Sequence, residues 1–383
     1  MTRTRLASPS LPVFLLAAAV VALLAFGITR WVTDRGVDAL PPLQITSGDT
    51  AAAAPGALNA NKLFSSRVDT TVSIEATIND EPMNGSGVVV DAERGLIVTA
   101  SHVVKDYQAA TEASVIVAKF HRGDEVLAKL VAIDQMNDLA ILEIDPAQLD
   151  GRLVAAPLGD SDKVLVGAEV MSIGAPFGHE FTPTVGIISA THRVIDSQIN
   201  ANSRIPDAIQ HDGSVNTGNS GGPLFDARGQ VIGINQQIAT PAKVSSGVSF
   251  AVSSNLVRRA VEQYKATGAK DITYADLGLD NTRDITPQLA NEGELAVERG
   301  ALVQLATGPA QAAGIGGGRM IEHLGKPVTL GDAIVAVGGQ PITSADDLAR
   351  AQALLDPQAP TTVTVVRGGK QVEVAITPAT RAL

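Results

Sequence analysis

The stretch NTGNSGGPLFDARGQVIGIN, residues 216–235, places one serine in a turn with three glycines and then continues into a strand. A serine hydroxyl is a weak nucleophile that needs a neighbouring base and donors for the oxyanion formed when it attacks a carbonyl. The N–H groups of Gly218 and Ser220 can both point into one hollow, because Gly218 has no Cβ in the way. The residues therefore indicate a nucleophile at Ser220. An ordinary β-turn and a phosphate loop are the alternatives, and the phosphate loop lacks the Lys-Ser/Thr pair and helix that should follow it.

Candidates for the base and for the acid that orients it lie earlier in the chain. Of six histidines, only His102 has a distinctive frame, LIVTASHVV, in which a buried strand ends just before the imidazole. Asp138 opens the apolar run DLAILEID, so its carboxylate needs a partner. Asp134 lies four residues earlier in a turn-like stretch and is the weaker alternative. Long gaps separate the three positions, so only a fold can bring them together.

The elements that must position these residues are short strands. From Thr70 onward, runs such as TVSIEATI, GLIVTAS and DLAILEID alternate or are rich in β-branched residues, with turn residues between them. This pattern predicts an all-β barrel or sandwich. A helix pattern first appears at 254–267, where Leu256, Ala260, Val261 and Tyr264 share one face. Ser253 or Ser254 can cap its start and Gly268 can end it, and we place a domain boundary there.

Four segments in this order, GSGVVVDAERGLIVTASHVV, NDLAILEID, GAEVMSIGAPFG and NTGNSGGPLFDARGQVIGIN, resemble the signature segments of the HtrA/Deg serine proteases. The resemblance implies a mainly β protein, with a chymotrypsin-like double six-stranded β-barrel over residues 62–268. It also implies that Ser220 is the nucleophile, His102 the general base and Asp138 the group that orients His102. The N–H groups of Gly218 and Ser220 become the oxyanion hole. The family more often has Pro at position 217 and Asn at position 101, where this chain has Thr217 and Ser101.

Substrate preference is predicted from fewer residues. In chymotrypsin-like folds the residue six before the nucleophile lies near the base of the pocket for the side chain preceding the cut. Here that residue is Ser214, which has no carboxylate, so we expect small or β-branched apolar residues rather than Lys or Arg there. We also expect the backbone of Ile234, Asn235 and Gln236 to pair with an extended substrate by β-addition.

Residues 269–383 resemble the smaller α+β PDZ domain that follows the protease in this family. We expect a helix over about 344–355 and a hairpin that turns at 367–370. Leu277, Gly278 and Leu279 fall where PDZ domains place the loop whose N–H groups hold a peptide C-terminal carboxylate, with the two leucines at the rim of the pocket. An ordinary small α+β domain with that glycine in a turn is the alternative. The insertion 316–330 is expected to be a mobile loop or a contact surface.

The N-terminus carries an apolar run of 18 residues, 11–28, preceded by two arginines and followed by the only tryptophan, Trp31. The run is long enough to span about 27 Å, so we predict a transmembrane anchor within residues 1–35, with a cleaved signal peptide as the alternative. Residues 36–61 read as a linker. Either alternative exports the body of the protein, and the anchor places the catalytic domain in the periplasm at the inner membrane.

Composition excludes several kinds of partner and site. The net charge of −11 argues against nucleic acid. The absence of cysteine excludes disulfides, a cysteine nucleophile and zinc–thiolate sites, and we expect no cofactor and no metal. The sequence thus predicts a membrane-anchored periplasmic serine endopeptidase that cleaves misfolded or regulatory envelope proteins. The resemblance further implies a homotrimer packed through residues near the start of the protease domain, for which Leu63 and Phe64 are the candidates. The alternative is a catalytically silent PDZ-based binding or chaperone module.

Overall fold

The structure is a computed structural model that describes residues 58–175, 179, 181–197, 199, 204–236 and 247–381. The predicted anchor and nearly all of the predicted linker lie outside these residues. No helix in the described ranges is long and apolar enough to cross a membrane. The linker prediction is wrong at its last residues, because helix α2 (Ala60–Arg67) begins at Ala60 with Asn59 as its N-cap.

The first half of the protease region is a curled sheet of seven strands in the order β7-β6-β1-β2-β3-β9-β8. The strands are β1 (Thr71–Ile78), β2 (Glu81–Asp91), β3 (Leu96–Ala100), β6 (Val115–Phe120), β7 (Glu125–Leu127), β8 (Lys129–Asp134) and β9 (Leu139–Glu143). The two end strands, β7 and β8, are consecutive in the chain and are separated only by Ala128. The sheet thus returns on itself through one bent segment, and counting that segment once gives the expected six strands.

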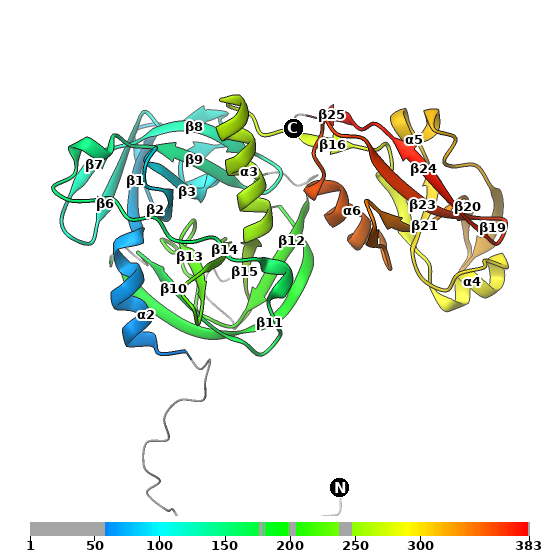
Figure 1. The fold of residues 1–383 in the computed structure, drawn as a ribbon, viewed down its shortest axis with the longest axis horizontal. Coiled ribbons are helices and arrows are strands. Elements are labelled where there is room, and N and C mark those ends of the chain that lie inside the picture. The colour runs from blue at the N-terminus through cyan, green and yellow to red at the C-terminus, as the bar shows by residue number, and fades with distance from the viewer. Residues whose placement is uncertain are drawn as a thin grey trace, which may run out of the picture. The chain divides into compact units, whose positions relative to one another are not determined.

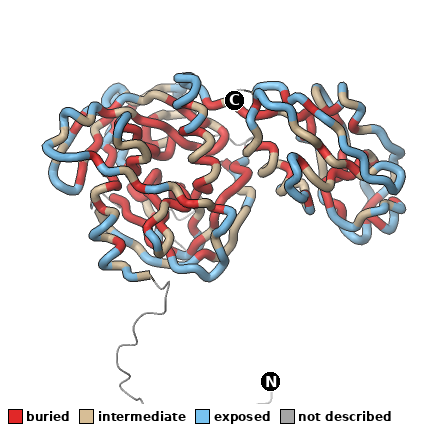
Figure 2. Tube along the Cα trace, in the orientation of Figure 1, coloured by how far each residue is buried: buried red, intermediate tan, exposed pale blue. Residues whose placement is uncertain are grey.

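The second half is a closed barrel of six strands in the order β10-β11-β12-β15-β14-β13. These are β10 (Glu169–Gly174), β11 (Thr182–Asp196), β12 (Arg204–His211), β13 (Pro223–Asp226), β14 (Val231–Asn235) and β15 (Ser249–Ser253). Figure 1 shows the two sheets beside each other, with helix α3 (Ser254–Thr267) packed along them. Aliphatic side chains of both sheets pack with α3 in a core that includes Val98, Ile173 and Leu256, and each sheet has a further buried cluster of its own. Figure 2 shows the buried residues concentrated within the two sheets. The mainly β, chymotrypsin-like prediction is confirmed for this region.

The helix predicted from the amphipathic pattern is present. Ser253 caps its start through a hydrogen bond from the amide of Leu256, and Gly268 ends it in the left-handed conformation that glycine adopts without strain. The remaining short elements near the sheets are the pair β4 (Lys105–Asp106) and β5 (Thr111–Glu112) and the 3-10 helices η1 (Val68–Thr70), η2 (Ser101–Val103), η3 (Pro146–Gln148) and η4 (Ser161–Lys163).

The C-terminal region is a small α+β structure. Its main sheet has the order β17-β18-β21-β23-β24, with β22 paired to β21. The elements are β16 (Tyr274–Asp276), β17 (Asn281–Asp284), α4 (Pro287–Gly293), β18 (Ala301–Leu305), α5 (Gly308–Ala312), β21 (Ala333–Val337), β22 (Gln340–Pro341), α6 (Ala345–Leu354), β23 (Thr361–Arg367), β24 (Lys370–Ile376) and β25 (Ala379–Arg381). The predicted helix is α6, capped by Ser344, and the predicted hairpin joins β23 to β24 through Gly368 and Gly369, both at positive φ.

The insertion at 316–330 forms a β-hairpin of β19 (Arg319–His323) and β20 (Lys326–Leu330). Val328 and Leu330 are buried against Leu289 and Leu302. The nearly buried His323 imidazole lies 2.5 Å from the carboxylate of Glu292. The insertion is therefore a packed hairpin and not a loop, while its alternative role as a contact surface stays a prediction.

Candidate active site

Asp138 and His102 form a closely bonded pair between the turn after β8 and the 3-10 helix η2. The Nδ1 atom of His102 lies 2.6 Å from Oδ2 of Asp138. The other carboxylate oxygen, Oδ1, accepts from the hydroxyl of Ser101 at 2.6 Å and from the backbone N–H of His102 at 2.9 Å. With three donors, the nearly buried carboxylate fixes the imidazole through both its ring and its backbone.

This arrangement also sets the basicity of the imidazole. Burial by itself would lower the pKa of His102. The negative charge of Asp138 and the hydrogen bond to it outweigh burial, so the pKa of His102 is raised above its usual value. Asp138 rather than Asp134 is thus the acid that contacts His102, as the apolar run after Asp138 indicated.

Ser220 lies in the turn before β13 and is held against the first sheet. Its carbonyl accepts from the amide of Ser86 at 2.8 Å. A Cβ on Gly221, whose φ is +82°, would lie 2.3 Å from the Ser86 carbonyl and 2.6 Å from the amide of Ala100. The turn therefore packs directly on the end of β3, two residues before His102, and only glycine fits at 221. Within the described residues no hydrogen bond joins the hydroxyl of Ser220 to the imidazole, and such bonds often tighten only when substrate binds.

The amides of the turn divide into two groups. Those of Asn219, Gly221 and Gly222 each donate to a backbone carbonyl, at 2.9, 2.8 and 3.0 Å. Those of Gly218 and Ser220 donate no hydrogen bond within the described residues. These are the two N–H groups predicted from the sequence to form the oxyanion hole.

Ser86 on β2 was given no role by the sequence, although it lies in the quoted GSG segment. Its hydroxyl donates to the carbonyl of Gly218 at 2.7 Å and accepts from the amide of Ala175 at 3.0 Å. The backbone N–H of Ser86 also donates to the carbonyl of Ser220, so hydrogen bonds from this one residue hold both Gly218 and Ser220 of the nucleophile turn. Ser101 was noted only as a departure from the family pattern. Its hydroxyl contacts both the Asp138 carboxylate and the hydroxyl of Tyr107, at 2.6 and 2.8 Å.

The predicted substrate-pairing strand is wrong for Ile234 and Asn235. Both are fully buried in β14, which is paired on one side to β13 and on the other to β15. The amide of Gln236 is also taken, by the carbonyl of Phe250 at 3.0 Å, and its side-chain amide donates to the carbonyl of Asp138 at 3.3 Å. These groups therefore brace the site from inside the barrel. Ser214 is exposed, and its carbonyl accepts from the side-chain amide of Asn219 at 3.2 Å.

A hollow of about 380 Å³ lies beside His102. Its walls combine the apolar side chains of Ile78, Met83 and Ile199 with polar and charged ones, which include Glu81, Lys105 and Asp106.

The three residues predicted to hold a peptide carboxylate are only partly available. Leu277 is fully buried in the core of the C-terminal region, so it cannot line the rim of a pocket. The amide of Gly278 already donates to the carboxylate of Asp276 at 2.8 Å. Leu279, which is 2% exposed, lines a hollow. The prediction is therefore wrong for the Leu277 side chain at the rim, and the amide of Gly278 is already bonded within the chain.

A second histidine–aspartate pair lies apart from these residues. Nδ1 of His192 is 2.9 Å from Oδ1 of the fully buried Asp207, and Asp162 completes a group that could hold a metal ion. Arg350 already occupies this group as a cation: its Nε lies 3.4 Å from Asp207 and its guanidinium pairs with Asp162. The group therefore has its positive partner from the chain itself.

Known proteins with this arrangement were found by sequence and by structure. The family described as "Trypsin-like peptidase domain" matches residues 85–234, which contain all three predicted triad residues. The solved structure of the HtrA-type protease AlgW with a tripeptide is 30% identical, with a TM-score of 0.65, and the match covers 84% of this chain and 97% of that one. The chain belongs to the HtrA/Deg family of serine proteases.

Curated relatives of this HtrA/Deg chain carry matching names. A Brucella suis protein named "Probable periplasmic serine endoprotease DegP-like" is 37% identical over 296 residues, covering 76% of this chain and 52% of the relative. The Escherichia coli "Periplasmic pH-dependent serine endoprotease DegQ" is 33% identical over 293 residues, covering 76% and 58%. The chain thus spans about half the length of the curated relatives it matches.

Proposed function

We propose that the chain is a periplasmic serine endopeptidase in which Ser220, His102 and Asp138 act as a catalytic triad. The observation that carries the proposal is the Asp138 carboxylate. It receives three donors from residues 101 and 102, and it leaves the Nε2 side of the imidazole as the only proton acceptor on the ring. That tautomer is the one a serine nucleophile requires.

In this mechanism the hydroxyl of Ser220 attacks the peptide carbonyl while Nε2 of His102 takes its proton. The imidazolium that forms is stabilised by the charge of Asp138. The free amides of Gly218 and Ser220 receive the negative charge on the carbonyl oxygen, and a group of this kind contributes about 10²- to 10³-fold to the rate. His102 then donates its proton to the leaving amine, and water completes the cycle through the same groups.

A fluorophosphonate probe tests the proposal, because only a competent triad activates a serine for phosphonylation. We expect labelling of the wild-type protein at Ser220 and none in Ser220→Ala. Cleavage of an unfolded protein substrate should be lost in the same variant. Peptide binding by a wild-type protein that neither labels nor cleaves would instead favour the silent binding module.

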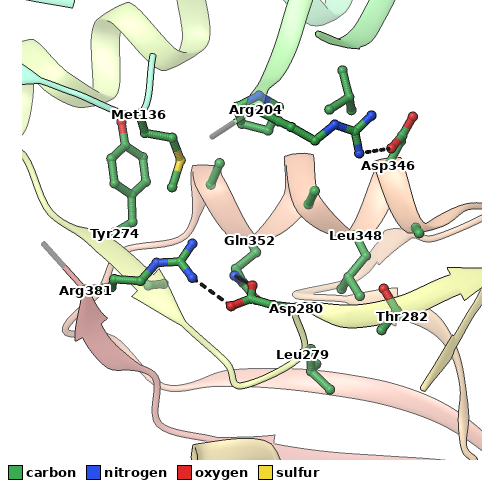
Figure 3. Close-up of a pocket in the computed structure, with 16 residues that line it drawn as sticks. Met136, Arg204, Tyr274, Leu279, Asp280, Thr282, Asp346, Leu348, Gln352 and Arg381 are labelled. Atoms are coloured by element: carbon green, nitrogen blue, oxygen red, sulfur yellow. Dashed lines mark hydrogen bonds and ion pairs between the residues drawn. The ribbon is translucent and has the colours of Figure 1, made fainter. Parts of the chain in front are cut away.

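We further propose that the C-terminal region is a PDZ domain that binds peptide C-termini between β17 and α6. β17 is the edge strand of its sheet, so one side of its backbone is free for an added strand. A hollow of about 460 Å³ lies along this edge, lined by Leu279 and Thr282 on the strand side and by Leu348 and Gln352 of α6 (Figure 3).

At the end of this hollow, the groups placed to bind a carboxylate differ from those predicted from the sequence. The amides of Leu279 and Asp280 donate no hydrogen bond in the described part of the chain. Nη1 of Arg381 is 2.7 Å from Oδ2 of Asp280, as Figure 3 shows, so its guanidinium already pairs with one carboxylate and has only its other N–H groups to offer a second. We propose that these two amides and Arg381 receive the peptide carboxylate, in place of the amide of Gly278.

The periplasmic assignment is supported by the names of the curated relatives. Anchoring through residues 11–28 and trimer formation through Leu63 and Phe64 remain proposals. Leu63 is buried beneath Gly229 and contributes to the protein's own core, whereas Phe64 is partly exposed. Phe64 is therefore the better candidate for a contact between copies, and sedimentation of Phe64→Ala against wild type tests it.

A further inference from the structure

The turn that carries Asp138 is strained. Asp138 has a φ of +53°, in the left-handed region that side chains other than glycine seldom adopt. A residue stays in such a conformation only when its surroundings hold it there. At Asp138 itself, residues 101 and 102 hold the carboxylate, and the backbone carbonyl accepts from the amide of Ser101 at 2.9 Å and from the side-chain amide of Gln236 at 3.3 Å. The part of the turn before Asp138 is held by a separate group.

That separate group is a buried polar group of three side chains. Oδ1 of Asp134 accepts from the amide of Asn137 at 3.2 Å, and Oδ2 accepts from the side-chain amide of Asn137 at 2.9 Å. The hydroxyl of Tyr274 donates to the same Oδ2 and accepts from the Asn137 side chain at 2.5 Å. All three residues are at most 2% exposed. The residue directly before Asp138 is thus bonded through both its backbone and its side chain.

Tyr274 reaches this group from outside the two sheets. It is the first residue of β16, beyond α3 and at the beginning of the C-terminal region. The segment before it adds to the edge of β8: the amide of Ile133 donates to Lys270 at 2.7 Å, and the amide of Ile272 donates to Ile133 at 2.9 Å. The guanidinium of Arg259 lies 4.2 Å from the centre of the tyrosine ring. The hydrogen bonds to Ile133 and the contact with Arg259 fix the position of the tyrosine ring. Figure 3 shows the ring beside Met136, which belongs to the same turn as Asp138.

We propose that the hydroxyl of Tyr274 is a positioning group, which through Asp134 holds the turn that carries Asp138 against the catalytic histidine. Without this hydroxyl, a buried carboxylate oxygen loses one of its two donors, and Asn137 loses one acceptor. Burial raises the pKa of Asp134, which means that the buried carboxylate depends on its hydrogen bonds to stay charged. Loss of one donor therefore destabilises this group of three side chains. The turn then relaxes from its left-handed conformation, and the bond from Asp138 to His102 loosens. The inference rests on the proposed role of Asp138.

The decisive variant is Tyr274→Phe, which removes one oxygen and keeps the ring under Arg259. The matched control is Tyr264→Phe, another buried tyrosine, whose hydroxyl lies 3.5 Å from Glu143 and does not reach the turn. We expect kcat for a short peptide to fall about tenfold in Tyr274→Phe with KM little changed, since misplacing a catalytic group by about 1 Å can cost 10²-fold. The control should stay within about twofold. The concentration of active sites is measured by probe titration and kcat is calculated from it, so that a smaller fraction of folded protein does not lower the value.

A second readout is independent of turnover. The proton on Nδ1 of His102 should give a low-field resonance, which is assigned by its absence in His102→Ala and thereby distinguished from that of His192. We expect this resonance to weaken and to exchange faster with water in Tyr274→Phe, and to be unchanged in Tyr264→Phe. If Tyr274→Phe does not fold, Asn137→Ala serves in its place with the same expectations.

The outcomes separate this inference from the proposed function. If Tyr274→Phe matches Tyr264→Phe in kcat and in the resonance, the positioning role is wrong while the triad stands. If the wild-type protein neither cleaves nor labels, the proposed function fails, and the resonance alone then decides whether Tyr274 holds the turn. Loss of both kcat and the resonance in Tyr274→Phe, with neither changed in the control, supports the inference.

Discussion

Replacing Asp138 by asparagine changes one atom and should remove nearly all activity. Two fixed features decide which way the new side-chain amide turns. The hydroxyl of Ser101 and the backbone N–H of His102 both donate to Oδ1, at 2.6 and 2.9 Å, so the oxygen of the new amide must take that position. Its NH₂ group then faces Nδ1 of His102, where the carboxylate oxygen lies 2.6 Å away in the wild type.

An NH₂ group at that place can only donate, so Nδ1 becomes the acceptor and the ring proton moves to Nε2. The imidazole can then no longer take the proton of Ser220. We expect kcat to fall by about 10⁴-fold, as a wrong tautomer does in serine proteases, which is roughly 5 kcal/mol at 1.36 kcal/mol per decade. In the opposite orientation of the amide, its NH₂ group would face the backbone N–H of His102. Two donors would then point at each other, so this orientation is unfavourable.

The assay is hydrolysis of a fluorogenic peptide by Asp138→Asn, with thermal unfolding to confirm that the variant folds. Asp207→Asn is a matched control, because Asp207 is also a buried aspartate bonded to a histidine Nδ1, that of His192. We expect this control to retain activity within about tenfold. If Asp138→Asn kept a kcat within about tenfold of wild type, the tautomer argument and the assignment of Asp138 would both be wrong.

The site and the peptide groove lead to four other expected outcomes. Ser220→Ala should lower peptide cleavage by about 10⁴-fold or more without lowering the unfolding temperature, and near-normal turnover would remove it as the nucleophile. The rate should rise with pH through the pKa of His102, above 6.5, because the protonated imidazole cannot accept a proton and activity is lost as pH falls through that pKa; a profile flat from about pH 5 to 8 would contradict this. Gly221→Ala should abolish probe labelling and destabilise the protein by a few kcal/mol, because its Cβ would lie 2.3 Å from a backbone carbonyl at a positive φ; calorimetry of a stable, active variant would show the turn to be adaptable. A hydrophobic-ended peptide should bind the groove at least about tenfold more tightly than its C-terminally amidated twin, and Arg381→Ala should reduce that difference in a fluorescence titration; equal binding of the two peptides would exclude carboxylate capture.

The sequence by itself determined the elements and the chemistry that depends on local pattern. The alternation of apolar and polar residues indicated the short strands, since one face of each must be buried. Ser253 and Gly268 marked the ends of α3, because a helix leaves unpaired N–H and C=O groups that those residue types satisfy. The glycines around Ser220 indicated the nucleophile turn, because a glycine at 218 lets two backbone N–H groups point into one hollow. The close approach of Gly221 to β3, which leaves no room for a Cβ, came from the structure.

Only the tertiary structure decided which groups meet across long gaps. Strand β14 reads as a strand in the sequence, but its alternation does not say which neighbours take its two edges, so Ile234 and Asn235 were wrongly assigned to the substrate. The same limit applies to Ser86 and Tyr274, whose hydroxyls look ordinary in sequence. Their importance comes from the packing of β2 on the nucleophile turn and of β16 beside β8, and hydrogen bonds between distant segments leave no local pattern to find.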